Sequence, residues 1–355
     1  RGGLLVGRDG QGDGRGVAQN RMRLVVLPAP GSGLQSMYVT GQLERLFVHL
    51  GYYANAFDLA YVTWGDPEEE ARLWKPFSDQ TGARLVHASR RRTALRRAEV
   101  VRCMNLSAAR TVLPSLRPFV VSLGADYAAI ARIHGRPAWK WRLLQAVAIR
   151  RAACVLVPNR RMATDLMVRH PGRPIRHHPN WVDCERFRPG EPLTRIRRYR
   201  TVLFVGRLVK EKNIETLAAA VATRPDLRLV CVGEGPLRDR LTQLKAECVG
   251  AQPWTSLPSW YHGADVFAMP SLSEGHPKAL AEAMACGLPC VVSQAVTEGG
   301  DAVYRTDDLV GGLKELLRED VAGDYGRMAR AWACAQWDVR TLMPREIDYL
   351  KAAAR

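Results

Sequence analysis

The sequence lacks any run of about 18 apolar residues, the length at which a transmembrane helix is expected, so no membrane-spanning helix is predicted. Residues 1–20 are rich in Gly and Arg and contain no apolar core, so they predict a disordered tail rather than a signal peptide. None of the eight cysteines form a C-x-x-C pair. Cys103, Cys154, Cys231 and Cys290 stand in apolar contexts, which predicts buried free thiols in a reducing, cytoplasmic compartment.

Metal-binding patterns are also missing. No D-x-D pair ends a predicted strand and no His or Cys residues have zinc-ligand spacing, so we expect an activity without a metal or other cofactor. No internal repeat is evident. In nucleic-acid-binding motifs, aromatic residues often alternate with cations. Few do so in this sequence, so no nucleic acid partner is predicted.

Acidic residues are scarce relative to basic ones: 52 Lys and Arg against 35 Asp and Glu give a formal net charge of +17. Such an excess attracts anionic membranes or acidic substrates, although a GC-rich genome would also raise the Arg content. Residues 139–151 combine Trp, aliphatic residues and cations on a predicted helix. This helix could lie peripherally on an anionic membrane surface or pack into the core with an Arg-rich outer edge, and the sequence favours neither.

Strand-like apolar runs alternate with helical stretches along the chain. Residues 22–28 predict a first strand, followed by the turn Gly31-Ser32-Gly33, which we expect to contact the ligand, and by an amphipathic helix over 34–50. After an Arg- and Pro-rich break, the alternation restarts at Thr201. Further strands of the first half are predicted over residues 59–64, 83–88, 100–106, 118–123 and 154–158.

This alternation predicts the fold class: α/β, with two doubly wound parallel-sheet, Rossmann-like domains that face each other across a ligand-binding cleft. The predicted boundaries are a first domain over residues 21–186, a linker over 187–200 and a second domain over 201–336.

Two carboxylates, Glu274 and Glu282, are separated by seven residues in a stretch that runs from a turn into an Ala-rich helix starting near Pro277. A helix N-terminus has unpaired N–H groups and a partial positive charge, so it can bind phosphate. Glu282 could accept hydrogen bonds from sugar hydroxyl groups beside that phosphate, and Glu274 could reach a group beyond it, which suits a nucleotide sugar. The alternative is an exposed i,i+4 pair of Lys278 and Glu282. The predicted binding residues at the helix start are Gly275, His276, Pro277, Lys278 and Ala279.

A second phosphate-binding pattern lies upstream. Residues 201–206 predict a buried strand that ends at Gly206 and leads into a turn with Arg207 and Lys212, after which Asn213 can cap a helix. A doubly wound sheet holds phosphate at its carboxyl edge with this arrangement. The alternative is a solvated turn whose cations have no ligand.

One βα unit later, a strand over residues 227–233 leads to the turn Gly233-Glu234-Gly235-Pro236, with Pro236 at the start of a helix. Glycine lets a backbone approach a ligand closely. Alone, this pattern is more often just a turn, but it lies between the Arg207 turn and the Glu274 turn. We therefore include Gly233, Glu234 and Gly235 in the predicted site.

Together these segments resemble the retaining family 4 glycosyltransferases. The stretch from Glu274 to Glu282, with its P-S-x-x-E-G and A-M-A-C-G-x-P flanks, is similar to the E-x7-E signature of that family, and G-R-L-x-x-E-K-N, which begins at Gly206, is similar to its diphosphate clamp. The run P-N-W-V-D at residues 179–183 resembles the family's entry to the linker. The likeness covers about residues 150–292.

The resemblance implies a GT-B architecture in which the C-terminal helix, residues 337–355, crosses back to the first domain. It implies that a sugar moves from a nucleoside diphosphate sugar to a hydroxyl group of a glycan or lipid-linked acceptor, with retained anomeric configuration and without a metal. Arg207 and Lys212 would hold the diphosphate, Glu282 the ribose and Glu274 the donor sugar. Base selection is expected around residues 251–254.

Three features depart from the family pattern. No His follows the strand over residues 118–123, and Asp126 is the nearest polar candidate for a catalytic role there. Trp181 replaces the usual Gly. The segment 293–306 is short, and Glu298 with the two glycines after it is its only similarity to the family's G-x-x-E turn. Two rival functions stay open: nucleotide-sugar hydrolysis or epimerisation on the same architecture, and a basic, non-catalytic protein that binds nucleic acid.

Overall fold

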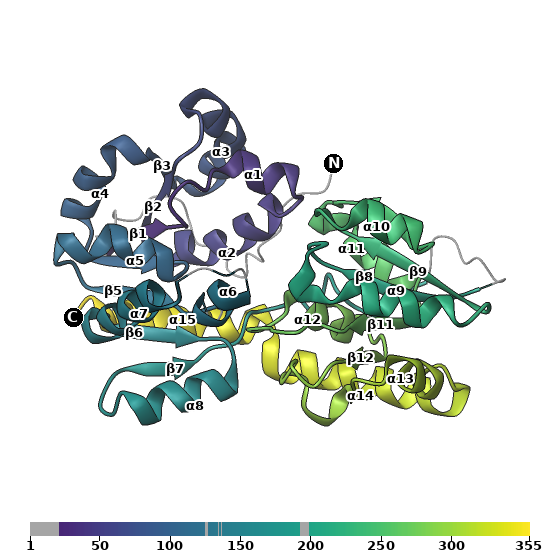
Figure 1. The fold of residues 1–355 in the computed structure, drawn as a ribbon. Helices are drawn as coiled ribbons and strands as arrows, with labels where there is room; N and C mark the ends of the chain where they lie inside the picture. The colour runs from purple at the N-terminus through teal and green to yellow at the C-terminus, as the bar shows by residue number, and fades with distance from the viewer. Residues whose placement is uncertain (1–20, 125–126, 134, 136, 192–198) are drawn as a thin grey trace. The chain divides into compact units, whose positions relative to one another are not determined.

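The computed structural model describes residues 21–124, 127–133, 135, 137–191 and 199–355. The predicted tail over residues 1–20, the candidate Asp126 and residues 192–198 of the predicted linker lie outside this part. The chain divides into two compact units (Figure 1). Unit 1 comprises residues 1–122, 147–155 and 343–355, and unit 2 comprises residues 123–146 and 156–342. The chain contains two parallel sheets with helices, which confirms the predicted α/β class with two parallel-sheet domains.

The first sheet has seven strands in the order β3-β2-β1-β4-β5-β6-β7. Its order reverses between β1 and β4, as in a doubly wound sheet. The strands predicted from apolar runs are confirmed with slightly shorter bounds, except β2, which is shifted by one residue, and β7 was not predicted. The strands are β1 (Arg23–Leu27), β2 (Asp58–Thr63), β3 (Arg84–His87), β4 (Val100–Cys103), β5 (Phe119–Ser122), β6 (Cys154–Val157) and β7 (Ile175–His177).

The helix predicted over residues 34–50 is wrong in one respect, because it is two helices. Gly41 adopts φ +68°, a left-handed conformation that ends α1 and lets the chain turn into α2. The helices that accompany the first sheet are α1 (Leu34–Val39), α2 (Leu43–Ala56), α3 (Pro67–Thr81), α4 (Arg91–Arg97), α5 (Leu106–Val112), α6 (Tyr127–Ile133), α7 (Trp139–Arg151) and α8 (Arg160–Arg169).

Aromatic side chains hold α2 and α3 on β2 in unit 1. Phe47 of α2 stacks on Phe77 of α3 with ring centroids 4.9 Å apart, and Tyr61 of β2 stacks on Trp74 at 5.4 Å. All four side chains are buried. The indole N–H of Trp74 donates to the carbonyl oxygen of Ala83 at 3.0 Å, so its one polar group is satisfied inside the core.

A buried ion pair anchors the part of the last helix, α15 (Val339–Ala353), that belongs to unit 1, from Met343 onwards. Glu346 accepts a hydrogen bond from Nε of Arg102 at 2.6 Å and another from the hydroxyl group of Tyr53 at 2.7 Å. Arg102 also donates to Ser122 Oγ at 2.8 Å. The side chains of Arg102 and Glu346 are only 3% and 2% exposed. This network therefore joins β4, β5, α2 and α15 with almost no contact with water.

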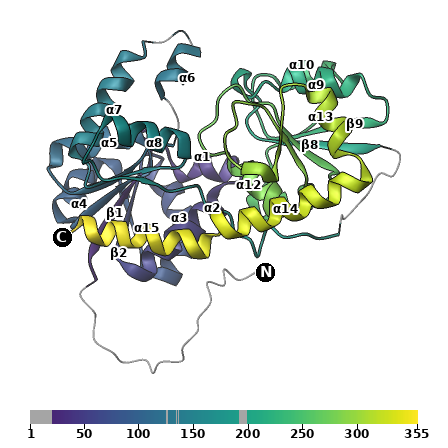
Figure 2. The same cartoon turned by 90° about the horizontal axis from the view of Figure 1, so that it is seen from below.

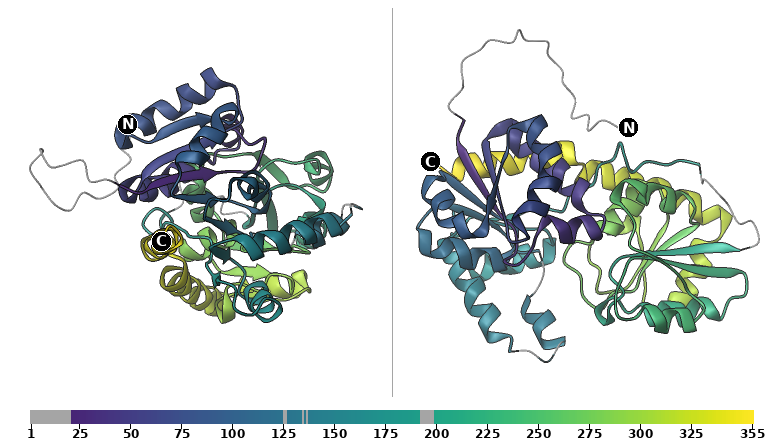
Figure 3. Two further views of the ribbon diagram at one scale, coloured as in Figure 1. Left: turned by 90° about the vertical axis from the view of Figure 1, so that its left-hand side faces the viewer. Right: turned by 90° about the horizontal axis from the view of Figure 1, so that it is seen from above.

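The second sheet lies in unit 2 and has six strands in the order β10-β9-β8-β11-β12-β13, which run side by side in the right-hand view of Figure 3. Every register described for this sheet is parallel, with β8 at the centre between β9 and β11. The strands are β8 (Arg200–Val205), β9 (Leu227–Val232), β10 (Glu247–Gly250), β11 (Val266–Met269), β12 (Cys290–Val292) and β13 (Tyr304–Arg305).

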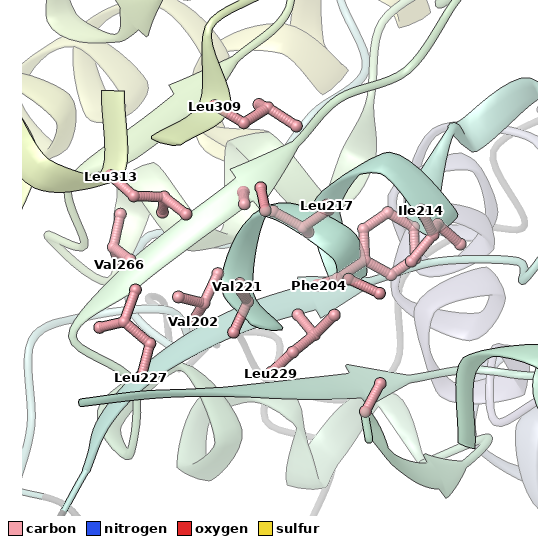
Figure 4. Packing of buried hydrophobic residues seen from close by; sticks show 14 of the residues in the cluster. Val202, Phe204, Ile214, Leu217, Val221, Leu227, Leu229, Val266, Leu309 and Leu313 are labelled. Atoms are coloured by element: carbon pink, nitrogen blue, oxygen red, sulfur yellow. The ribbon is translucent and has the colours of Figure 1, made fainter. Parts of the chain in front are cut away.

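Helices cover both faces of this sheet. On one face, α9 and α13 pack against β8, β9 and β11 through Leu217, Val221 and Leu313 (Figure 4). On the other side of the sheet α12 packs against α14 (Figure 2). The bounds are α9 (Ile214–Ala222), α10 (Arg238–Gln243), α11 (Leu257–His262), α12 (Lys278–Ala285), α13 (Leu309–Leu316) and α14 (Glu319–Trp337). This two-sided burial leaves the loops at the carboxyl ends of the strands to carry polar groups.

The four cysteines predicted to be buried thiols outside disulfides, Cys103, Cys154, Cys231 and Cys290, are buried and form no disulfide. Burial raises the pKa of the Cys290 and Cys103 thiols above the usual value, and for Cys103 to about 12. These thiols are therefore protonated core groups at neutral pH.

Candidate active site

The loops after β8, β9 and β10 are tied to one another at the carboxyl edge of the second sheet. The N–H of Gly233 donates to the carbonyl oxygen of Gly250 at 2.8 Å, and the N–H of Leu208 donates to that of Glu234 at 2.8 Å. A Cβ on Gly233 would lie 1.9 Å from the carbonyl oxygen of Gly206, and one on Gly235 would lie 2.3 Å from that of Leu208. These glycines are thus required for the close approach of neighbouring loops, whether or not a ligand is bound.

Lys212 and Glu274, predicted from different motifs, are in contact. Lys212 Nζ donates to Glu274 Oε1, and Ser271 Oγ donates to the same oxygen at 2.8 Å. The side chains of Lys212 and Glu274 are 16% and 10% exposed, so the pair is largely shielded but not sealed. The loop after β8 and the loop after β11 therefore bring one cation and one carboxylate to a common point.

Arg207 behaves differently from Lys212. Its side chain is 72% exposed, and Arg207 Nη2 lies 3.3 Å from Oε1 of the buried Glu211. An exposed guanidinium can change its rotamer at little cost, so it can turn towards an anionic ligand. Lys212 is already held in place by Glu274, whereas Arg207 has room to move.

Asn213 does not cap α9 as predicted. It adopts φ +54° and ψ 33°, and its side chain makes no hydrogen bond to a helical N–H. Instead Thr216 Oγ1 donates to Asn213 Oδ1 at 2.7 Å. Asn is one of the few residues that tolerate this left-handed conformation, which turns the chain from Lys212 into the helix. The predicted helix start at Pro236 is also displaced, because α10 begins at Arg238.

Glu282 is buried in unit 2, with 3% of its surface exposed. Trp254 Nε1 donates to Glu282 Oε1 at 3.2 Å, and the hydroxyl group of Tyr261 donates to Oε2 at 3.0 Å. The alternative of an exposed pair with Lys278 is therefore wrong. Glu282 also acts on its neighbour: burial first, and then the Glu282 charge, raises the pKa of the Cys286 thiol well above its usual value.

The turn before α12 is held from two other segments. Asn159 Nδ2 donates to the carbonyl oxygen of Gly275 at 3.0 Å, and Asn180 Nδ2 donates to that of His276 at 2.8 Å. The His276 ring meets Trp337 edge-on at 4.6 Å. Pro277 is the residue that precedes the helix, so its missing N–H removes no donor from the first helical turn. Both Asn residues follow Pro in the sequence, and that was the only signal for their role.

Glu298 lies close to the start of α8. Its Oε1 accepts a hydrogen bond from the backbone N–H of Arg160 at 3.2 Å. Burial raises the pKa of the Glu298 carboxyl above its usual value, while this N–H and the charges of Arg160 and Arg305 lower it less. Glu298 was the residue compared with the glutamate of the family's G-x-x-E turn. In this structure its carboxylate accepts a hydrogen bond from within the chain.

The Gly31-Ser32-Gly33 turn lies in unit 1, where a carboxylate of the chain meets it. Glu70 is fully buried and accepts hydrogen bonds from the N–H groups of Leu34 at 2.7 Å and Gln35 at 3.0 Å. A Cβ on Gly33 would lie 2.6 Å from Glu70 Oε1. The first N–H groups of α1 are thus used by Glu70, and an anionic ligand at this turn would compete with it.

Two cavities can be compared with the positions of Glu274 and Glu282, and the second of them is lined by Ser271, which donates a hydrogen bond to Glu274. One of about 590 Å³ in unit 1 is lined by β1, β3 and α4, and one of about 380 Å³ in unit 2 is lined by residues that include Ser271 and Asp307. Neither is lined by Glu274 or Glu282, so the site is located by its side chains and loops. Within the described ranges, no group of three His, Cys, Asp or Glu side chains could hold a metal ion. Among these residues, no helix combines the length and the apolar character needed to cross a bilayer.

Comparisons with known proteins show what this chain is similar to. Residues 199–319 match the family model described as Glycosyl transferases group 1. The GDP-mannose-dependent alpha-mannosyltransferase of Corynebacterium glutamicum is 33% identical over 171 residues, which are 46% of this chain and 38% of the relative. The protein of the same name from Mycolicibacterium smegmatis is 32% identical over 220 residues, 58% of this chain and 55% of the relative. The chain therefore matches 38% and 55% of the length of these two curated relatives.

Among solved structures, Anabaena HepE in complex with UDP and glucose superposes with a TM-score of 0.71 at 16% identity, covering 93% of this chain and 100% of HepE. At this identity the likeness shows the fold, which is GT-B: two parallel-sheet α/β domains. The match at residues 199–319 and the two mannosyltransferase relatives agree with the predicted resemblance to the family 4 glycosyltransferases.

Proposed function

We propose that the protein is a retaining glycosyltransferase that moves a sugar from a nucleoside diphosphate sugar to a hydroxyl group of a glycan or lipid-linked acceptor in the synthesis of a cell-envelope polysaccharide. The contact between Lys212 and Glu274, next to the start of α12, carries the proposal. It brings a cation and a carboxylate to the edge of the sheet where α12 begins. The names of the two mannosyltransferases and the UDP in the HepE complex support a nucleotide-sugar donor.

In this mechanism the chain positions the donor and stabilises charge. Negative charge grows on the diphosphate as its bond to the sugar breaks. Lys212, Arg207 and the N–H groups at the start of α12 would stabilise that charge. Glu274 would bind the donor sugar, and the leaving diphosphate would accept the proton of the attacking hydroxyl group. We propose that no metal takes part, since these groups already supply positive charge.

Product analysis separates this proposal from its rivals. Incubation with UDP- and GDP-sugars should give a glycosylated acceptor by mass spectrometry. Free sugar or an epimerised nucleotide sugar without acceptor would favour the hydrolase or epimerase. Retention on nucleic acid with a steep salt dependence, and no nucleotide binding, would favour the nucleic-acid-binding protein.

Replacing Glu282 by Ala should weaken nucleoside diphosphate binding by about 1–3 kcal/mol, the scale of hydrogen bonds to a charged group. Isothermal titration of the native protein and the variant with UDP and GDP measures this loss. Glu319→Ala, on a side chain that is 94% exposed, is the control. If the folded Glu282 variant binds as tightly as the native protein, the assignment of Glu282 to the ribose is wrong.

Peripheral attachment to an anionic membrane is the second part of the proposal, and α7 is the surface that supports it. Trp139, Leu143 and Val147 follow at intervals of four and are 62%, 58% and 39% exposed. They share one face of the helix, and Lys140 and Arg142 lie beside them. Trp141 stacks instead on Tyr127 at 5.0 Å. The exposed stripe therefore contains Trp139 but not Trp141.

Co-sedimentation with vesicles tests this surface. Binding should require anionic lipid and fade with salt, because each cation near such a surface contributes about 1 kcal/mol. Replacing Trp139 and Leu143 together by Ala should lower the bound fraction. A double Ala variant of Leu116 and Val168, 77% and 76% exposed outside α7, should bind like the native protein. Failure of the native protein to sediment with anionic vesicles at low salt would contradict the attachment.

A further inference from the structure

Two aromatic side chains hold the carboxylate of Glu282. Trp254 lies in the segment where base selection was expected, and Tyr261 had no predicted role. The indole N–H of Trp254 and the hydroxyl group of Tyr261 each bind a different carboxylate oxygen, at 3.2 Å and 3.0 Å. Both side chains are 1% exposed. Because a donor lies on each oxygen, the two hydrogen bonds set the plane of the carboxylate as well as its position.

The two donors are themselves fixed by packing. The Phe187 ring lies 5.5 Å from Trp254 and 6.0 Å from Tyr261, so it contacts both. Trp181 meets Trp254 edge-on at 6.3 Å, and the Arg186 guanidinium lies over the Trp254 ring at 4.7 Å. Neither ring can change rotamer without moving these neighbours. Trp181, which departs from the family's usual Gly, is part of this support.

Neutral donors orient a carboxylate without cancelling its charge. A Lys or Arg partner would form a stronger bond and compete with a ligand, whereas an indole N–H and a phenolic O–H leave the negative charge in place. A carboxylate has about four lone-pair positions. A carboxylate whose plane is fixed can therefore accept hydrogen bonds from two hydroxyl groups on neighbouring carbons. A ribose has such a pair of hydroxyl groups, and a 2′-deoxyribose does not.

We propose that Trp254 and Tyr261 are positioning residues that orient Glu282 towards the vicinal hydroxyl groups of a ribose, and so set a preference for ribonucleotides over 2′-deoxyribonucleotides. The inference rests on the proposed function. A merely structural role, in which the two donors only satisfy a buried carboxylate, would change stability without changing this preference.

The experiment compares Trp254→Phe and Tyr261→Phe with the native protein. Each change removes one donor and keeps a ring. Dissociation constants for UDP and 2′-deoxy-UDP, and for GDP and 2′-deoxy-GDP, are measured by isothermal titration, and the melting temperature is recorded. The matched controls are Trp332→Phe, whose indole N–H has no partner in the described structure, and Tyr325→Phe, which packs against Tyr304.

In the native protein, the better-bound diphosphate should bind about tenfold more tightly than its 2′-deoxy form, the scale of one hydrogen bond to a charged group. Both Phe variants should lower that ratio at least threefold through weaker binding of the ribonucleotide. The controls should keep the native ratio. Glu282→Gln, which keeps a side chain of similar size, should lower the ratio as well.

The possible failures are distinct. If the native protein binds neither UDP nor GDP, the proposed function fails. If it binds one of them with a ribose preference that Glu282→Gln lowers but both Phe variants keep, the positioning role alone is overturned. If a Phe variant does not fold, the other one decides, because each removes a separate donor.

Discussion

Turnover should fall by about 10²-fold or more when Lys212 is replaced by Ala, the scale seen when a donor that stabilises transition-state charge is removed. Lys212 is the less exposed of the two clamp cations and is oriented by Glu274. Its charge is needed most when the bond to the diphosphate breaks. The variant should therefore lose kcat more than affinity for the nucleotide sugar, and Arg207→Ala should do the same.

Steady-state kinetics and titration with the donor measure the two effects separately. Lys210→Ala is the matched control, because Lys210 lies in the same short turn and is exposed. Removing Lys212 also leaves Glu274 without that cation, so the melting temperature must be recorded beside the rate. Native kcat in a folded Lys212→Ala variant would show that the cation does not act on the leaving group.

The second large effect concerns stability. Replacing Glu346 by Ala should lower the free energy of unfolding by about 3–5 kcal/mol, because breaking a buried ion pair leaves the other charge without compensation. Arg102 is 3% exposed and would lose its carboxylate partner, and the hydroxyl group of Tyr53 would lose the hydrogen bond that it donates to Glu346. Because Glu346 lies on α15, the docking of that helix should weaken first.

Urea unfolding followed by circular dichroism measures the loss. Asp348→Ala, an exposed acidic residue on the same helix, is the control and should change the stability by less than about 0.5 kcal/mol. A change of similar size in both variants would mean that the Arg102–Glu346 pair contributes nothing particular to the anchoring of α15.

The strands, and the segments that bring Lys212 and Glu274 together, could be predicted because each depends on a local pattern. A buried parallel strand needs a short apolar run, so residues 201–206 and 227–233 predicted β8 and β9 within one residue. The contact of Lys212 with Glu274 follows from topology, because β8 and β11 are neighbours and their carboxyl ends meet at one edge.

The features that were missed depend on contacts between distant residues or on single backbone angles. The sequence predicted that Glu282 lies on an Ala-rich helix. It did not predict that Trp254 and Tyr261, 28 and 21 residues away, would donate hydrogen bonds to its carboxylate. The hydrogen bonds from the first N–H groups of α1 to Glu70 were not predicted either, because Glu70 lies on a different helix, α3. The left-handed angles at Gly41 and Asn213 replaced a continuous helix and a side-chain cap.

The central claim is that this chain binds a nucleoside diphosphate through Glu282 and the start of α12. Isothermal titration of the native protein and of Glu282→Ala with UDP, GDP and ADP tests it most directly. We predict that at least one of the three binds the native protein and that the folded variant binds it about 5- to 150-fold more weakly, the equivalent of 1–3 kcal/mol. No binding of any of the three to the native protein, or equal binding to both, would contradict the claim.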